Sequence, residues 1–211
     1  MKKSYLAVIF LIVLSFAIGF YFYPQLPEQA ASHWNAQGEV NGYMSSFWAA
    51  FLMPIVLTVI FLFFVFIPKI DPLKENVVKF RKFFDGLIIL TSFFIFYVYL
   101  LSLAWNLGKV FDMNLFIVPA MAALFFYCGI MVENAKRNWF IGIRNPWTIS
   151  NDEVWDKTHK IGGKLFKAAG LLALIGLFFP DLSMFFILIP VILIVVFTTI
   201  YSYLQYRKLK F

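Results

Sequence analysis

Residues 47–67 read FWAAFLMPIVLTVIFLFFVFI, an uninterrupted run without a charged side chain. An α-helix needs about 20 apolar residues to cross the hydrocarbon core of a bilayer, so this run predicts a transmembrane helix. The whole chain of 211 residues agrees, since 62% of it is hydrophobic, 14% is charged and its mean hydropathy is +0.82. A soluble fold of this size has too little interior for that much apolar surface. The composition therefore predicts an integral membrane protein and excludes a disordered or disulfide-rich chain.

Five further apolar stretches of similar length accompany the first one. The N-terminal stretch follows Met1-Lys2-Lys3, but it is too long for a signal peptide and no small-residue cleavage site follows directly, so we expect a retained helix. We predict an all-α, polytopic membrane protein in one domain, residues 1–211. Residues 1–67 would form an N-terminal hairpin and residues 83–211 a four-helix part. The six predicted spans lie near Tyr5–Tyr23, Phe47–Ile67, Phe83–Ala104, Leu115–Val132, Leu165–Phe179 and Met184–Leu204.

Lysine and arginine are distributed unequally among the predicted connections. All but one of the 18 basic residues lie at the N-terminus, in the second and fourth loops or in the C-terminal tail, and only Lys109 lies on the other side. Cytoplasmic loops are enriched in Lys and Arg, so both termini are predicted to be cytoplasmic in a multi-pass cell-membrane protein. The net charge of +7 is then a topology signal. Direct nucleic-acid binding is not expected, because the aromatic residues are not interleaved with basic ones.

The first connection, residues 24–46, is predicted to be extracytoplasmic and ordered. Two prolines end the first helix, and Asn41-Gly42-Tyr43 gives a turn signal farther along. A disordered linker would not need aromatic residues between such turns, so we expect a small cap that rests on the membrane through them. The candidate residues of this outer loop are Pro24, Pro27, His33, Trp34, Asn35 and Gly38.

The fourth connection, residues 133–164, is the longest polar segment and is predicted to be cytoplasmic. Ser150 and Glu153 fit a capping box, and apolar residues recur at helical spacing after them. Residues 151–162 therefore predict an interfacial amphipathic helix, with Gly162-Gly163 as the corner before the fifth span. Arg144, between a glycine and a proline, is a candidate to accept a carboxylate or phosphate from a partner.

Catalytic and metal sites have little support in the sequence. His33 and His159 lie on opposite sides of the predicted membrane and cannot share a metal ion. A surface salt bridge with Asp156 explains His159. The acidic cluster of Asp152, Glu153 and Asp156 fits the start of a helix, where negative charge complements the helix dipole. We expect no catalytic residue, no metal and no cofactor.

The segment Gly142-Ile-Arg-Asn-Pro-Trp-Thr-Ile149, followed by Glu153-Val-Trp155, resembles the signature of the SdpI family of bacterial membrane proteins. Residues 24–38 resemble the companion N-terminal domain of unknown function found in longer members. The chain departs from the pattern at Asn145, where the family usually has Thr, and at Ser45-Ser46, where a basic residue often stands. The motif residues are Asn138, Gly142, Arg144, Pro146, Trp147, Thr148, Glu153 and Trp155.

This resemblance implies an immunity protein that gives resistance to a secreted membrane-active antimicrobial peptide. It also implies sensing, in which a cytoplasmic transcriptional autorepressor is captured at the membrane. The implied partners are membrane lipids, the peptide and the repressor, with the outer loop meeting the peptide and the cytoplasmic motif carrying the response.

Two alternatives remain open at this point. The first is a membrane enzyme or transporter for a lipid-linked or amphiphilic substrate at the cytoplasmic interface. In that case Arg144 would hold a phosphate, and Asp152, Glu153 and His159 would converge on a pocket for acid–base work. The second is a passive scaffold subunit, which would have a stable partner and no protective effect.

Overall fold

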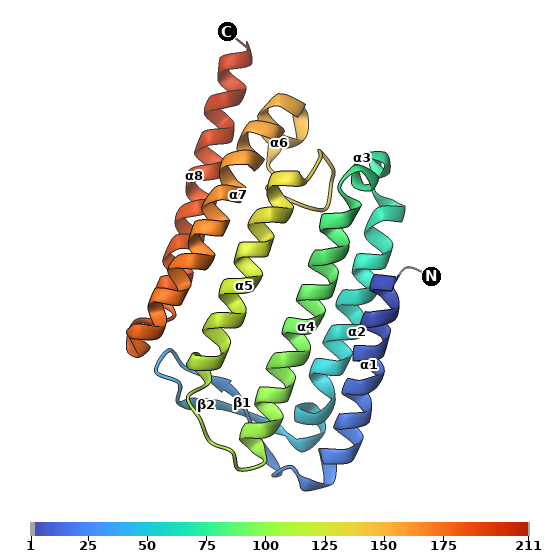
Figure 1. Ribbon diagram of the computed structural model, residues 1–211, viewed down its shortest axis with the longest axis vertical. Helices are drawn as coiled ribbons and strands as arrows, with labels where there is room; N and C mark the ends of the chain where they lie inside the picture. Colours follow the sequence, from blue (N-terminus) through green and yellow to red (C-terminus); the bar gives the residue numbers. More distant parts are fainter. Residues whose placement is uncertain (1–2, 211) are drawn as a thin grey trace.

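The computed structural model describes residues 3–210, with the side chain of Lys210 left out, and it is built from long helices (Figure 1). Lys2, which contributes to the predicted charge asymmetry, lies outside the described residues. Within them, six helical segments are long and apolar enough to cross a membrane, which confirms the predicted number of spans. The long helices are α1 (Lys3–Phe22), α2 (Ser46–Ile70), α4 (Arg81–Asn106), α5 (Met113–Asn134), α7 (Asp152–Ile175) and α8 (Phe185–Lys210). Short helices are η1 (Tyr23–Gln25), α3 (Lys74–Lys79), α6 (Pro146–Ser150), η2 (Gly176–Phe178) and η3 (Pro180–Leu182).

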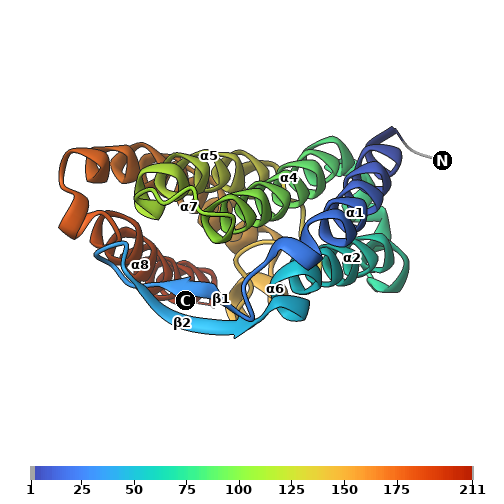
Figure 2. The same cartoon turned by 90° about the horizontal axis from the view of Figure 1, so that it is seen from below.

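The long helices form an open arc. Helices α1, α2 and α4 pack on one another, α4 contacts α5, α5 packs on α7, and α7 packs on α8. Seen from below, the strands β1 and β2 cross the open side of this arc (Figure 2). Two buried clusters involve α1, α2 and α4. One lies around Tyr99 near the strands, and the other lies at the opposite end and extends from Phe84 across the end of α5 to Trp155 of α7.

Helices α5 and α7 form the closest pair because glycines lie between them. A Cβ atom on Gly163 would lie 2.6 Å from the carbonyl oxygen of Gly129, and one on Gly170 would lie 2.6 Å from that of Ala122. Small residues permit this approach in membrane helices. The predicted corner at Gly162-Gly163 is therefore wrong: α7 continues through it, and residues 152–162 are the first half of one helix.

The connection after α1 contains an antiparallel hairpin, β1 (Gln29–Trp34) and β2 (Val40–Ser45), which the all-helical prediction did not include. Its turn is made by Asn35, whose side-chain oxygen accepts hydrogen bonds from the N–H groups of Gln37 and Glu39. Gly38 provides the left-handed position at φ +78°. The predicted turn at residues 41–43 is wrong, since these residues belong to β2 and Gly42 pairs with His33.

Candidate functional site

The chain carries two candidate sites at opposite ends of the long helices (Figure 1). The motif end contains the loop of residues 135–151 between α5 and α7, and the hairpin end contains β1 and β2. In the motif-end loop, Asn138 is completely buried. Its amide nitrogen donates to the carbonyls of Lys136 (2.8 Å) and Ile141 (2.9 Å), and its amide oxygen accepts from the N–H groups of Phe140 (2.9 Å) and Ile141 (2.6 Å). Asn138 therefore holds the shape of the loop.

Gly142, His159 and Trp155 form the inner wall of this loop. Gly142 has φ +112°, and a Cβ atom there would overlap the ring of His159. The His159 ring is stacked on Trp155 with centroids 3.8 Å apart, and its Nε2 accepts a hydrogen bond from the N–H of Ile143 (3.0 Å). Its Nδ1 lies 2.9 Å from the carbonyl oxygen of Trp155, which it can reach only as a donor. The ring is thus neutral, with its proton on Nδ1.

The predicted salt bridge between His159 and Asp156 is wrong. His159 is 1% exposed because its ring fills the inside of the loop, whereas Asp156 faces outward and lies 3.6 Å from the ammonium of Lys136. The indole N–H of Trp155 donates to the carbonyl of Ala135 at 2.8 Å, which closes the base of the loop.

Helix α6 is positioned by Asn145 and Thr148. Pro146 occupies its first turn, where a missing N–H costs nothing. The side-chain oxygen of Asn145 caps the N–H groups of Trp147 and Thr148, and its amide nitrogen donates to Ser202 of α8 at 2.8 Å. Asn145, which departs from the family pattern, thus caps α6 and also contacts α8.

The start of α7 differs from the predicted capping box. Asn151 is the N-cap, with its side-chain oxygen accepting from the N–H groups of Glu153 (2.8 Å) and Val154 (3.1 Å). Ser150 instead donates to the carbonyl of Trp147, so the prediction that it caps this helix is wrong. An asparagine directly before the acidic pair was available in the sequence as the better cap.

The acidic residues at the start of α7 each have a separate partner. Asp152 pairs with Arg137 at 2.7 Å, and Glu153 pairs with Lys157, four residues later on the same helix, at 2.7 Å. Both carboxylates are exposed, while His159 is buried inside the loop. The enzyme alternative required Asp152, Glu153 and His159 to converge on a pocket, and the structure separates them.

Arg144 is the motif residue whose charge remains available to a partner. It is exposed, and its guanidinium donates to the carbonyl of Trp139 at 2.6 Å. Within residues 3–210 it forms no ion pair with a carboxylate. Trp139 beside it is 48% exposed, whereas Trp147 packs on Tyr203 of α8.

Two polar residues that the sequence analysis missed fix this loop from the side of α2. Asp71 is 2% exposed, and its carboxylate accepts from the N–H of Trp139 at 3.0 Å. Asn76 of α3 donates to the carbonyl of Arg137 at 2.9 Å. The sequence feature that could have identified Asp71 is its position as an acidic residue after an apolar span and directly before Pro72.

At the hairpin end, two asparagines tie the strands to the helices. The side chain of Asn106 accepts from the N–H of Ala31 at 2.7 Å and donates to its carbonyl at 3.0 Å. Asn114 donates to the carbonyl of Ala36 at 2.9 Å. Both lie at ends of apolar spans, and this position could have marked them as contacts for the loop.

Some of the predicted outer-loop residues build the loop itself, and the others line a pocket. Pro24 lies in η1 and Pro27 is exposed beside it, whereas Asn35 and Gly38 build the turn of the hairpin. The structure brings the remaining two, His33 and Trp34, to one pocket.

This pocket, of about 200 Å³, lies between β1 and helices α2, α4 and α5. Met53, Met113 and Met184 supply much of its apolar lining. Trp34 packs edge-on against Trp105, and its buried Nε1 has no hydrogen-bond partner among residues 3–210. Buried donors are normally paired, so a free indole N–H beside a pocket indicates a place for an acceptor.

Comparisons with known proteins match segments that contain the motif-end loop and the hairpin. Residues 134–202 match the SdpI/YfhL protein family, and residues 10–58 match a domain of unknown function, DUF1648. The chain is 25% identical to the immunity protein SdpI of Bacillus subtilis (strain 168), in an alignment that covers 100% of this chain and 99% of the relative. No solved structure matches the chain. These matches confirm the resemblance seen in the motifs: the chain is a multi-pass membrane protein that joins a DUF1648 segment to an SdpI-family segment.

Proposed function

We propose that this chain gives resistance to a secreted membrane-active antimicrobial peptide and is not an enzyme. Its full-length similarity to an immunity protein supports a role of this kind. The separation of Asp152, Glu153 and His159 supports the absence of catalysis at the motif end.

Both termini lie in the cytoplasm in this proposal, and the hairpin faces outward. The support is the charge distribution: Lys109, the one basic residue of the predicted outer side, follows α4 at the hairpin end. Lys and Arg elsewhere belong to the predicted cytoplasmic segments, as the positive-inside rule requires. A peptide that arrives from outside would then meet the hairpin before any other part of the chain.

The pocket under the hairpin is the observation that carries the proposal. Its volume of about 200 Å³ is below the roughly 300–1,000 Å³ of small-molecule sites, so it suits one apolar side chain of a peptide. The free N–H of Trp34 would donate to a carbonyl of the bound peptide, and His33 at the rim would contact its neighbouring residues. A peptide held in this way is withdrawn from the lipid.

The motif end would carry a response to the bound peptide. Arg144 is exposed and has no carboxylate partner in the described part of the chain, so it suits an acidic group on a cytoplasmic protein such as a transcriptional repressor. Asn138, Gly142, Thr148 and Trp155 would act as positioning residues that hold the loop on which Arg144 stands.

The test uses a sensitive bacterial host that expresses the full chain. These cells are exposed to the peptide fraction secreted by the strain in which this chain naturally occurs. A voltage-sensitive dye reports their membrane potential. We expect protection by the unmodified chain. Trp34→Phe removes the N–H and should raise peptide sensitivity about tenfold, since one buried hydrogen bond is lost.

Trp48→Phe is the matched control, because Trp48 is exposed on α2 and does not line the pocket. It should protect as well as the unmodified chain. Equal depolarisation with and without verified membrane expression would refute the protective role. Equal protection by the Trp34 and Trp48 variants would refute the proposed use of the pocket.

A further inference from the structure

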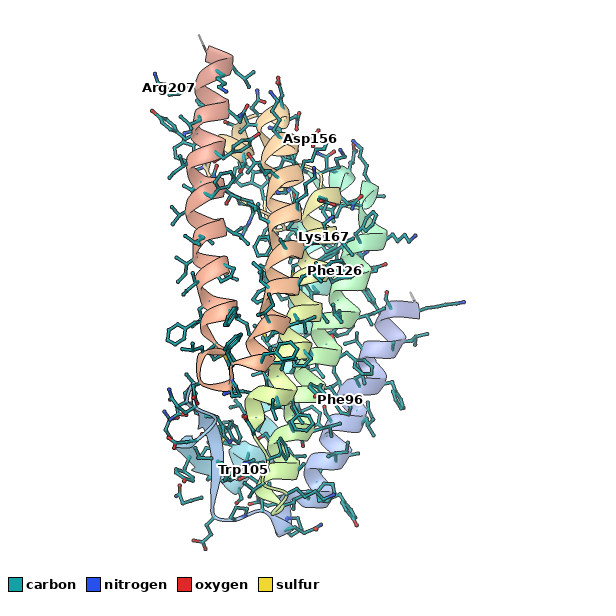
Figure 3. The ribbon with its side chains drawn as sticks, turned by 60° about the vertical axis from the view of Figure 1, so that its left-hand side comes forward. Phe96, Trp105, Phe126, Asp156, Lys167 and Arg207 are labelled. Carbon is teal, nitrogen blue, oxygen red and sulfur yellow. The ribbon has the colours of Figure 1, made fainter. Side chains whose placement is uncertain are left out.

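Helices α5 and α7 leave a groove along one side of the molecule, and its motif end is strongly polar. A hollow of about 490 Å³ lies there between the last turn of α5 and the first half of α7. Figure 3 shows Asp156 and Lys167 along this side, with Phe126 farther toward the hairpin end. The charged residues of the hollow are Lys136, Lys160, Lys164, Lys167, Glu133 and Asp156.

This hollow has more positive than negative charge. Lys167 pairs with Glu133 at 2.8 Å, and Lys136 lies 3.6 Å from Asp156, so both carboxylates are already engaged. Lys160 and Lys164 are exposed and have no carboxylate partner in the part of the chain that the structure describes. Two ammonium groups are therefore free to meet an anion.

Toward the hairpin end, the same groove becomes apolar. A second hollow, of about 480 Å³, lies between α4, α5 and α7, and Ala123, Phe126 and Leu171 are among its lining residues. The small Gly170 at its floor lets the two backbones approach, so the groove stays open above them. One continuous surface thus passes from ammonium groups to aliphatic and aromatic side chains.

The spacing along α7 makes the two hollows parts of one site. Lysines and leucines of the two linings follow each other at intervals of three or four residues, which places them on one helix face. The distance from Lys164 to Leu174 is about 15 Å at 1.5 Å per residue. Half of a hydrocarbon core of about 30 Å has the same depth. A molecule with an anionic head and chains of one leaflet's length therefore matches the groove.

We propose that the α5–α7 groove binds an anionic phospholipid, with its phosphate at Lys160 and Lys164 and its acyl chains on Ala123, Phe126 and Leu171. The two free ammonium groups select a lipid with net negative charge over a zwitterionic one. The Lys167–Glu133 pair marks the boundary between the head and the chains.

The test measures which lipid remains bound to the purified full-length protein. The protein, in mild detergent, receives an equal mixture of phosphatidylglycerol and phosphatidylcholine with identical chains, and native mass spectrometry counts the bound lipids. We expect selective retention of phosphatidylglycerol. Lys160→Gln with Lys164→Gln should lower that retention about tenfold. Ala123→Trp, which fills the apolar part, should also lower it.

Matched controls distinguish an effect of the groove residues on lipid retention from a general effect of lost charge or added side-chain volume. Lys82→Gln with Lys208→Gln removes two exposed charges outside the groove, and Ala17→Trp adds the same bulk on α1. Both should retain phosphatidylglycerol normally, and circular dichroism should show equal helix content in all variants. Equal loss in the control variants, or equal binding of both lipids, would overturn the proposal.

A third arm distinguishes a lipid from other anions. Inorganic phosphate and a soluble acidic peptide are added as competitors at the concentration of the lipid. Neither should displace phosphatidylglycerol, because neither occupies the apolar part. If either displaces it fully, or if Ala123→Trp has no effect while the lysine variant does, the groove is a headgroup-type anion or acidic-protein site and the lipid assignment is wrong.

Discussion

The motif-end loop and the hairpin are both held by side-chain hydrogen bonds to the backbone, but they differ in where these bonds lie. In the loop, Asn138 and Trp155 bond to the backbone from the inside and are completely buried. In the hairpin, Asn35 bonds to the turn from a half-buried position, and Asn106 holds the strand from the neighbouring helix. The loop is thus organised around its own core, whereas the hairpin is a surface structure attached to the helices.

This difference shows where function is to be sought in each region. Most of the residues that carry the family resemblance at the motif end are occupied in holding the loop, so Arg144 is the group that we propose for contact with a partner. At the hairpin end the free group is the indole N–H of Trp34, beside a pocket. In both cases the candidate is a polar group that keeps hydrogen-bonding capacity for a partner.

The largest expected effect compares two glycines with positive φ. Gly142→Ala places a methyl group against His159 in a backbone conformation that L-residues avoid, and should lower the free energy of unfolding by about 3 kcal/mol. Gly108→Ala at the hairpin end meets no atom within 4 Å and should cost about 1 kcal/mol. Unfolding in detergent, followed by circular dichroism, measures both. Equal losses would contradict the expectation that the contact with His159 adds to the cost at Gly142.

A second comparison uses the two structural asparagines. Asn138→Ala leaves buried backbone groups without partners and should cost about 2–3 kcal/mol. Asn35→Ala breaks similar bonds where water can replace them, and should cost at most about 1 kcal/mol. The same unfolding assay serves, and hydrogen exchange at Ile141 and Glu39 locates the loss. If Asn35→Ala lowered the free energy of unfolding more than Asn138→Ala, burial would not be what decides the cost of losing these hydrogen bonds.

The smallest effect on stability is expected at Arg144. Arg144→Ala should change the free energy of unfolding by less than about 0.5 kcal/mol, because the side chain is exposed and forms no ion pair with residues that the structure describes. Protection against the peptide should persist, while the transcriptional response of the native host to it should be lost, as RNA sequencing would show. Arg137→Ala is the control, since Arg137 bonds to Asp152 and Ile149. It should lower stability by about 1 kcal/mol. An unchanged response in Arg144→Ala would separate this residue from signalling.

The sequence predicted the number of spans because long apolar runs carry the signal by themselves. It misplaced the start of the fifth helix for a physical reason. The first half of α7 is polar on its exposed face, while its buried face, with Trp155 and His159, packs against a loop whose shape depends on distant residues. Hydropathy in a short window reports neither contact, so a continuous helix was divided in two.

The candidate sites were predicted only in part. Arg144 and Trp34 were found from their residue types and positions. Asp71, Asn106 and Asn114 were not, because each acts on a loop far away in the sequence. Their polarity at the ends of apolar spans was visible, but their partners depend on how the helices are arranged.

Helix α2 joins the two candidate sites mechanically. It begins at Ser46, directly after β2 ends, and it ends at Ile70, directly before the carboxylate of Asp71 that holds Trp139. Its 25 residues form a strut of about 37 Å with a binding loop fixed at each end. A tilt or rotation of this strut would therefore displace the hairpin and the motif-end loop together.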